Sequence, residues 1–238
     1  MYKFDSRIRY SEVGPDGCLT MESLINYFQD CSSFQSEELD IGIRYMNENQ
    51  LMWIVNFWQI DVLRYPRLGE EIRTGTLPYS IKSFLGLRNF MMETAQGELL
   101  AVANSVWSMV NTAENTLMRV PQEITDKYEL GEKLEMEYLP RKIRLPETDG
   151  TKLPEITIQE HHLDTNRHVN NGQFVRLALM EMPNVNRVRR LLVEYRKQAF
   201  LGDVMYPVKY EDGENTVIVS LNAADDTPYA VVRADAAQ

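Results

Sequence analysis

The sequence is poor in cysteine, histidine, positive charge and long apolar runs, and each shortage excludes a class of protein. Its two cysteines, Cys18 and Cys31, cannot build a disulfide scaffold. No Cys/His spacing is typical of a metal site. No apolar run approaches the ~18 residues of a membrane-spanning helix, and the first residues lack the apolar core of a signal peptide. We therefore expect a cytoplasmic protein that uses no metal or other cofactor.

The shortage of positive charge also narrows the choice of partners. A formal net charge of −10 opposes binding to the phosphates of nucleic acid. The length of 238 residues, 44% of them hydrophobic, suits one large domain or two small ones with a substantial core.

The two halves of the chain carry a weak internal repeat. The step Leu68-Gly69-Glu70 recurs as Leu201-Gly202-Asp203, 133 positions later, and the residues before each step align as well. In each half a helical stretch precedes strand-like runs. The first helix is expected over residues 21–39, with an apolar face formed by Leu24, Tyr27, Phe28 and Cys31.

Runs of β-branched and aromatic residues with mixed alternation predict the strands. The expected strands lie near residues 53–63, 70–79, 83–93, 99–111, 190–199, 203–210, 216–222 and 229–234. One long helix followed by antiparallel strands is an α+β pattern in which the sheet wraps around the helix. Prolines punctuate a charged segment between residues 122 and 155. We expect domains at 1–135 and 156–238, joined by a linker at 136–155.

The most informative stretch covers residues 164–171. Asp164, Asn166 and His168 alternate along it, and they are the base, the orienting dipole and the proton carrier that hydrolysis by an activated water requires. Asn170 and Asn171 are N-cap candidates for a following helix, whose free N–H groups can hold an oxyanion. A polar loop that only caps a helix is the alternative. The nearby His161 and His162 lack such neighbours, and we expect them on a strand edge.

Several further segments, taken in order with 164–171, resemble one known family. They lie between about residues 20 and 210 and comprise Arg64-Tyr65-Pro66, Gly69-Glu70, Arg88-Asn89-Phe90, residues 105–111 with Val120-Pro121, and residues 193–197. Together they resemble the acyl-ACP thioesterases, tandem hot-dog enzymes that release fatty acids from acyl carrier protein (ACP). The resemblance implies two hot-dog domains, an acyl-ACP partner, and catalytic parts for Asn166 and His168.

The sequence departs from that family at Gln198 and Ala199. The plant enzymes carry a Glu-Cys pair at this place, and both residues have been assigned catalytic parts. An amide can orient a water or a carbonyl, but it cannot take a proton at neutral pH. A cysteine nucleophile is therefore excluded here, and Glu194 lies four residues away, ~13 Å along a strand. Asp164, with His168 as its partner, becomes the leading candidate for the base.

The resemblance also suggests where the substrate binds. It places the acyl pocket on the apolar run that contains Met52, Trp53 and Val55, although such a run is equally typical of a buried strand. Asn170 and Asn171 are the candidates for contacts near the thioester.

Docking of an acidic carrier on a protein of net charge −10 requires a local basic patch. We expect the patch of Arg187, Arg189 and Arg190 to dock the carrier. A second candidate patch contains Arg141, Lys142 and Arg144. Both can equally be solvated surface charges.

Hydrolysis of acyl-ACP to free fatty acids is thus the function that we expect. An acyl-CoA thioesterase of the same fold is one alternative. A non-catalytic acyl-chain-binding module is another, because Gln198 replaces the family's carboxylate. A monomer and a homodimer are both compatible with two hot-dog units in one chain.

Overall fold

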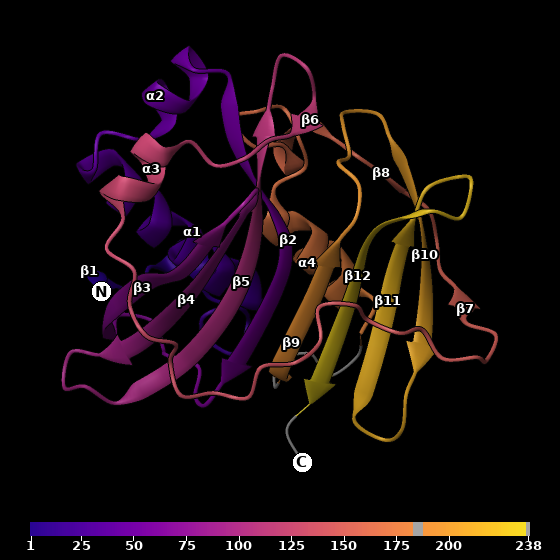
Figure 1. Cartoon of the computed structure of the whole chain (residues 1–238). Coiled ribbons are helices and arrows are strands. Elements are labelled where there is room, and N and C mark those ends of the chain that lie inside the picture. The colour runs from indigo at the N-terminus through magenta and orange to yellow at the C-terminus, as the bar shows by residue number, and fades with distance from the viewer. Residues whose placement is uncertain (183–187, 237–238) are drawn as a thin grey trace. The chain divides into compact units, whose positions relative to one another are not determined.

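The computed structural model describes residues 1–182 and 188–236, which form two compact units (Figure 1). The first unit contains residues 1–56 and 63–138, and the second contains residues 57–62 and 139–238. In chain order the elements are β1 (Tyr2–Arg7), α1 (Met21–Glu38), α2 (Ile43–Glu48), β2 (Leu51–Val62), β3 (Glu71–Lys82), β4 (Leu85–Thr94), β5 (Leu99–Asn111), β6 (Thr116–Leu117), α3 (Gln122–Lys127), β7 (Thr151–Lys152), β8 (Ile156–Thr157), α4 (Asn171–Met180), β9 (Val188–Tyr195), β10 (Val204–Glu211), β11 (Thr216–Asn222) and β12 (Pro228–Ala236). Short 3₁₀ turns, η1 (Tyr10–Glu12) and η2 (Glu160–His162), precede α1 and α4.

In the first unit, α1 packs against an antiparallel sheet with the strand order β1-β3-β4-β5. Thr20 caps the helix by accepting a hydrogen bond from the N–H of Ser23 at 3.2 Å. Leu24 and Phe28 are buried on the face that meets the sheet, where the Phe28 ring lies 5.3 Å from that of Phe90 on β4. Burial of this apolar face stabilises the helix against the sheet.

The second unit repeats this plan. Its strands are all antiparallel and follow the order β2-β9-β12-β11-β10-β7, with residues 57–61 of β2 pairing with β9 and β8 pairing with β10. Helix α4 packs on β11 and β12 through the buried Phe174, Val175 and Leu177. The predicted α+β architecture, a sheet wrapped around a long helix in each half, is confirmed.

The sequence located most strands well. β5 and β11 match the prediction residue for residue, and α1 ends one residue earlier than expected. The expectation for His161 and His162 was wrong, because they lie in η2 and not on a strand edge. The His162 Nδ1 accepts a hydrogen bond from the N–H of Gln159 at 3.0 Å, and such local bonds compete with strand pairing. The pattern gave no expectation for β1, α2 or α3.

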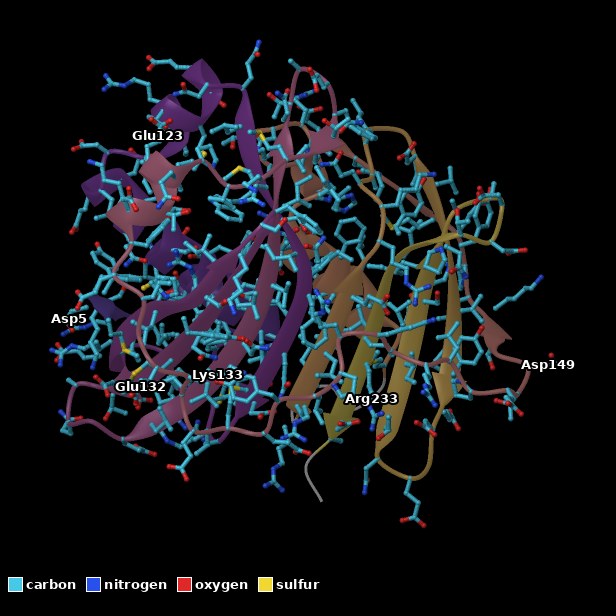
Figure 2. The ribbon with its side chains drawn as sticks, viewed as in Figure 1. Asp5, Glu123, Glu132, Lys133, Asp149 and Arg233 are labelled. Carbon is cyan, nitrogen blue, oxygen red and sulfur yellow. The ribbon has the colours of Figure 1, made fainter. Side chains whose placement is uncertain are left out.

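The segment between α3 and β7, residues 128–150, covers in each unit the face of the strands that the helix does not contact. In the first unit Phe90 faces α1, so the preceding Asn89 faces the other way. Its Oδ1 accepts hydrogen bonds from the Leu134 N–H at 3.1 Å and from the Tyr138 hydroxyl at 2.9 Å. Figure 2 shows Lys133 of this segment in front of the strands, where its ammonium lies 4.6 Å from the centre of the Tyr138 ring.

The same segment continues over the second unit. There the Ile143 N–H donates to the carboxylate of Glu194 on β9 at 2.9 Å, and the chain then reaches Gly150 beside β10. No helix in residues 1–182 and 188–236 is long and apolar enough to cross a membrane. The domain boundaries near residues 135 and 156, and the separate tasks of the two domains, stay a prediction.

Gly150 provides a test of this close approach. A Cβ at this position would lie 2.5 Å from Cγ1 of Val208 and 2.7 Å from the ring of Tyr210. We expect Gly150→Ala to lower the free energy of unfolding by ~1–3 kcal/mol, as overpacking does. Gly14→Ala is the control, because its nearest neighbour would be 3.4 Å away, and it should change stability by no more than ~0.5 kcal/mol. Equal denaturation midpoints for the two variants would contradict the close packing at Gly150.

Candidate active site

The stretch that carries Asp164, Asn166 and His168 folds into a tight turn immediately before α4. The Asp164 N–H donates to the His168 carbonyl at 2.8 Å, and the Arg167 N–H donates to the Asp164 carbonyl at 3.1 Å. Arg167 adopts a left-handed backbone conformation with φ of 64°. That conformation costs a residue other than glycine ~1 kcal/mol, so the contacts around the turn must hold it in place.

Asp164 helps to build this turn with its side chain. Its Oδ1 accepts hydrogen bonds from the Asn166 N–H at 2.8 Å and from the His168 N–H at 3.1 Å. One carboxylate oxygen thus fixes the backbone on which the two other motif residues stand. The second oxygen, Oδ2, makes no hydrogen bond within the described ranges and is free to accept one.

The residues that follow β9 meet this turn beside His168. The strand predicted near residues 190–199 ends at Tyr195, so Gln198 and Ala199 lie outside it. The Val169 N–H donates to the Ala199 carbonyl at 2.9 Å, and the rings of His168 and Phe200 lie edge to face with centres 5.0 Å apart. Gln198 directly precedes Ala199, so the chain brings it to the same place as Asp164, Asn166 and His168. In the part of the chain that the structure describes, no hydrogen bond occupies the side-chain amides of Asn166 and Gln198 or the imidazole of His168.

Helix α4 begins at the same point. Asn170 is its N-cap, as the sequence predicted, because its Oδ1 accepts a hydrogen bond from the Gly172 N–H at 2.8 Å. Asn171 is the first helical residue, and its carbonyl accepts a hydrogen bond from the Tyr195 hydroxyl at 2.9 Å. The partial positive charge of the helix N-terminus therefore lies next to the motif.

Burial controls the ionisation of two groups near the turn. It lowers the pKa of His162, with smaller contributions from His161 and Arg176. The neutral imidazole that results matches the hydrogen bond that Nδ1 accepts from Gln159. Burial also raises the pKa of Tyr195 well above its usual range, so this phenol stays protonated and donates.

The first half of the chain builds the same turn from other side chains. There the Gly14 N–H donates to the Cys18 carbonyl at 2.9 Å, and the Leu19 N–H donates to the Pro66 carbonyl at 2.9 Å. Gly17, with φ of 73°, takes the left-handed position. These contacts repeat, in the same order, those of residues 164–169 with Ala199.

The two turns share the same backbone hydrogen bonds but carry different side chains. Where the second turn carries Asp164, Asn166 and His168, the first carries glycine, aspartate and cysteine at positions 14, 16 and 18. Tyr65 occupies the position of Gln198. Because the backbone folds the same way in both turns, the fold alone does not require the polar set of the second turn.

The residues predicted to line an acyl pocket lie on the first half of β2. Val55 is buried, whereas Met52 and Trp53 are partly buried. The Trp53 ring covers Gly86 of β4, with ring atoms 3.0 and 3.1 Å from where a Cβ would be. It packs on an apolar cluster that consists of Ile41, Leu51, Met109, Val120, Ile124 and Tyr128. A buried strand explains this packing, and lining of an acyl pocket stays a prediction.

The three arginines predicted to form a basic patch, Arg187, Arg189 and Arg190, have different surroundings. Arg187 lies outside the described residues, and Arg189 is exposed. Arg190 pairs with Asp61 of β2, with Nε 2.5 Å from Oδ1. Neighbouring residues of a strand point to opposite faces, so Arg189 and Arg190 do not share a surface. The other predicted patch, formed by Arg141, Lys142 and Arg144, is exposed.

No group of three or more His, Cys, Asp or Glu side chains is placed to hold a metal ion in residues 1–182 and 188–236.

Several plant enzymes are similar to this chain in sequence. The chain is 28% identical over 223 residues to the chloroplastic acyl-[acyl-carrier-protein] hydrolase FATB1 of Cuphea viscosissima, a match that covers 86% of this chain and 53% of that protein. It is 23% identical over 252 residues to the chloroplastic oleoyl-acyl carrier protein thioesterase 2 of Arabidopsis thaliana, which covers 94% and 66%. The chain spans about half the length of the first of these relatives.

Solved structures share the fold over almost the whole chain. An acyl-ACP thioesterase from Bacteroides thetaiotaomicron matches with a TM-score of 0.88 and 22% identity, covering 98% of this chain and 96% of that one. The 12:0-ACP thioesterase from Umbellularia californica matches with a TM-score of 0.83 and 21% identity, covering 99% and 97%. These likenesses confirm the tandem hot-dog fold. The sequence pattern described as the acyl-ACP thioesterase N-terminal domain matches residues 1–128, more than half of the 238 residues, and the chain therefore belongs to the acyl-ACP thioesterase family.

Proposed function

We propose that this protein hydrolyses the thioester between a fatty acyl chain and ACP and releases the free fatty acid. The observation that carries the proposal is the turn before α4. It presents the free side chains of Asn166 and His168, and a free oxygen of Asp164, beside the segment after β9 that carries Gln198. The family membership supplies the class of substrate.

The reaction requires one bond to form and one to break. The oxygen of a water attacks the thioester carbonyl carbon, and the carbon–sulfur bond then breaks. Asp164 takes the proton from the water through Oδ2, and His168 delivers a proton to the leaving thiolate. The Asn166 amide orients the carbonyl, and the N-terminus of α4 stabilises the negative charge that develops on its oxygen.

Gln198 orients the water or the carbonyl without exchanging a proton, because an amide is not a base at neutral pH. The thioester suits such a modest site, since its carbonyl is electrophilic and a thiolate leaves readily. The absence of a thiol at Ala199 removes covalent catalysis from this position. Of the two cysteines in the sequence, Cys31 is buried, and burial raises its pKa to about 12, which makes it a poor nucleophile.

The two domains would divide the work. Residues 156–238 carry the catalytic turn, and residues 1–135 bind the acyl chain on the strand that contains Met52, Trp53 and Val55. Asn170 and Asn171 hold the thioester end of the substrate. Two free cysteines suit a reducing cytoplasm, where we propose that the protein acts without a cofactor.

The exposed residues Arg141, Lys142 and Arg144 are the better placed of the two candidate patches for docking ACP. Ile143, between them, is bonded to Glu194, which precedes Gln198 by four residues. Arg189 lies farther from Gln198, because it precedes Tyr195 by six residues, ~20 Å along β9. Arg190 is already neutralised by Asp61.

Turnover of the purified protein tests the proposal directly. Release of free fatty acid from acyl-ACP at a higher kcat/KM than from the matched acyl-CoA supports it. The reverse preference would make the protein an acyl-CoA thioesterase. Acyl-chain binding without turnover would make it a binding module, the alternative that Gln198 keeps open.

Removal of either motif side chain should abolish most activity. We expect Asn166→Ala and His168→Ala each to lower kcat by ~10²-fold or more, because each removes an orienting donor or an acid–base group. The matching change in the other turn, Cys18→Ala, should leave kcat unchanged. Steady-state kinetics on folded variants provide the measurement, and near-native kcat in both motif variants would refute this site.

The two functions given to Asp164 can be separated by two substitutions. Asp164→Asn keeps an oxygen for the backbone N–H groups of Asn166 and His168 but cannot act as a base, so kcat should fall by ~10²-fold or more with stability unchanged. Asp164→Ala should lose the same activity and also ~1–2 kcal/mol of stability, because two N–H groups lose their acceptor. A fully active Asp164→Asn enzyme would show that another group is the base.

Substitutions of Gln198 test whether this residue only orients the water or the carbonyl. Gln198→Ala should cost less activity than Asp164→Asn, since Gln198 only orients. Gln198→Glu restores the residue of the plant enzymes and should be tolerated or raise kcat. If instead Gln198→Ala reduced kcat as far as Asp164→Asn does, the division of labour between the two residues would be wrong.

Reversal of charge tests the docking surface. Changing Arg141, Lys142 and Arg144 together to Glu should raise KM for acyl-ACP at low salt, with a smaller effect at high salt. KM for a short acyl-thioester without a carrier should not change. Arg189→Glu tests the other patch, and Arg190 is left intact because its reversal would break the pair with Asp61.

The exposed Arg119, which precedes Arg141 by 22 residues, provides a control for charge alone. Arg119→Glu should leave KM for acyl-ACP unchanged. An unchanged KM in the triple variant, or an equal rise in Arg119→Glu, would remove the 141–144 patch as a docking surface.

A further inference from the structure

Tyr195, the last residue of β9, is the only tyrosine that we find bonded to the first turn of α4 within the described ranges. Its hydroxyl donates to the Asn171 carbonyl at 2.9 Å. Its ring packs edge to face on Phe174, with ring centres 5.7 Å apart. Both partners belong to α4, so one side chain of the strand holds the start of the helix at two points.

The bond from Tyr195 is one of two that tie the segment around Gln198 to α4 and to the turn before it. One bond comes before Gln198 in the sequence and the other comes after it. Before it, the Tyr195 hydroxyl bonds the Asn171 carbonyl at 2.9 Å. After it, the Ala199 carbonyl accepts from the Val169 N–H at 2.9 Å. Together they fix the separation between Gln198 and the N-terminus of α4.

The first half of the chain shows that the fold needs only one of these two contacts. The bond from Leu19 to Pro66 at 2.9 Å repeats the one from Val169 to Ala199. The position equivalent to Tyr195, however, carries Val62, which has no hydroxyl. The hydroxyl bond is therefore an addition to the repeated fold, and it is made in the half that carries Asn166, His168 and Gln198.

We propose that Tyr195 is a positioning residue for thioester hydrolysis, an inference that rests on the proposed function. In this role Tyr195 acts through α4 and not on the reacting atoms. It holds the first turn of α4, whose partial positive charge lies next to the motif, at a fixed distance from the Gln198 amide. A change of ~1 Å in such an arrangement costs up to ~10²-fold in rate.

Tyr195→Phe tests this, because it removes the hydroxyl and keeps the ring on Phe174. We expect kcat for acyl-ACP to fall ~10-fold while KM stays within about twofold, since the contact serves the transition state and not substrate binding. Tyr27→Phe is the matched control. The Tyr27 hydroxyl lies in the first unit, where it donates to Glu12 at 2.8 Å and also contacts Ser6 Oγ and the Arg7 carbonyl. Tyr27→Phe should lower Tm at least as much as Tyr195→Phe does and leave kcat unchanged.

A double variant distinguishes positioning from general weakening of the fold. If Tyr195 acts partly through Gln198, the variant with both Tyr195→Phe and Gln198→Ala will lose less than the product of the two single losses in kcat. Losses that multiply, or an unchanged kcat in Tyr195→Phe with Tm lowered as in Tyr27→Phe, would overturn the inference. A wild-type protein without turnover would instead remove the proposed function, and this inference with it.

Discussion

The hydrogen bond from the Val169 N–H to the Ala199 carbonyl is the contact on which the candidate site depends. It joins the turn that carries Asn166 and His168 to the segment after β9 that carries Gln198, and these two segments are about thirty residues apart in the sequence. The turn on one side of this bond is shaped by Asp164, and the helix on the other side is capped by Asn170. Together with the bond from Tyr195 to Asn171, it gives the motif side chains a defined position relative to the sheet.

The same chain contains a second copy of this arrangement that lacks the chemical groups, and the comparison explains which features belong to the fold. Both turns have a residue in the left-handed conformation, but the first uses Gly17 and the second uses Arg167, at a cost of ~1 kcal/mol. A hot-dog unit thus supplies the turn, the helix N-terminus and the bond to the strand end. The polar side chains are added to this frame in one half only. We propose that one unit performs hydrolysis and the other binds the acyl chain, and this division is what that proposal requires.

The sequence predicted what depends on local pattern. The alternation of apolar residues gave β5 and β11 their correct bounds, the spacing of Leu24 and Phe28 gave α1 its buried face, and Asn170 was correctly identified as a cap. The sequence did not predict contacts between residues that are far apart along the chain. The pair of Arg190 with Asp61 neutralises part of a patch that looked purely basic, and the segment after α3 covers strand faces that looked free. The two backbone bonds to Asp164 also went unnoticed, because a motif shows residue types but not which atoms are already occupied. His162 was misplaced for the same reason, since its bond to Gln159 is a local side-chain contact that competes with strand pairing.

The central claim is that water, activated at the turn before α4, attacks the thioester directly. It can be tested by a single turnover of acyl-ACP in ¹⁸O-labelled water with the protein in excess, followed by mass spectrometry of both the fatty acid and the protein. Direct attack predicts one ¹⁸O atom in the fatty acid released in the first turnover and none in the protein. Unlabelled fatty acid with the label on a carboxylate of the protein would show that Asp164 or another acid attacks the thioester itself. That result would contradict the assignment of Asp164 as a base.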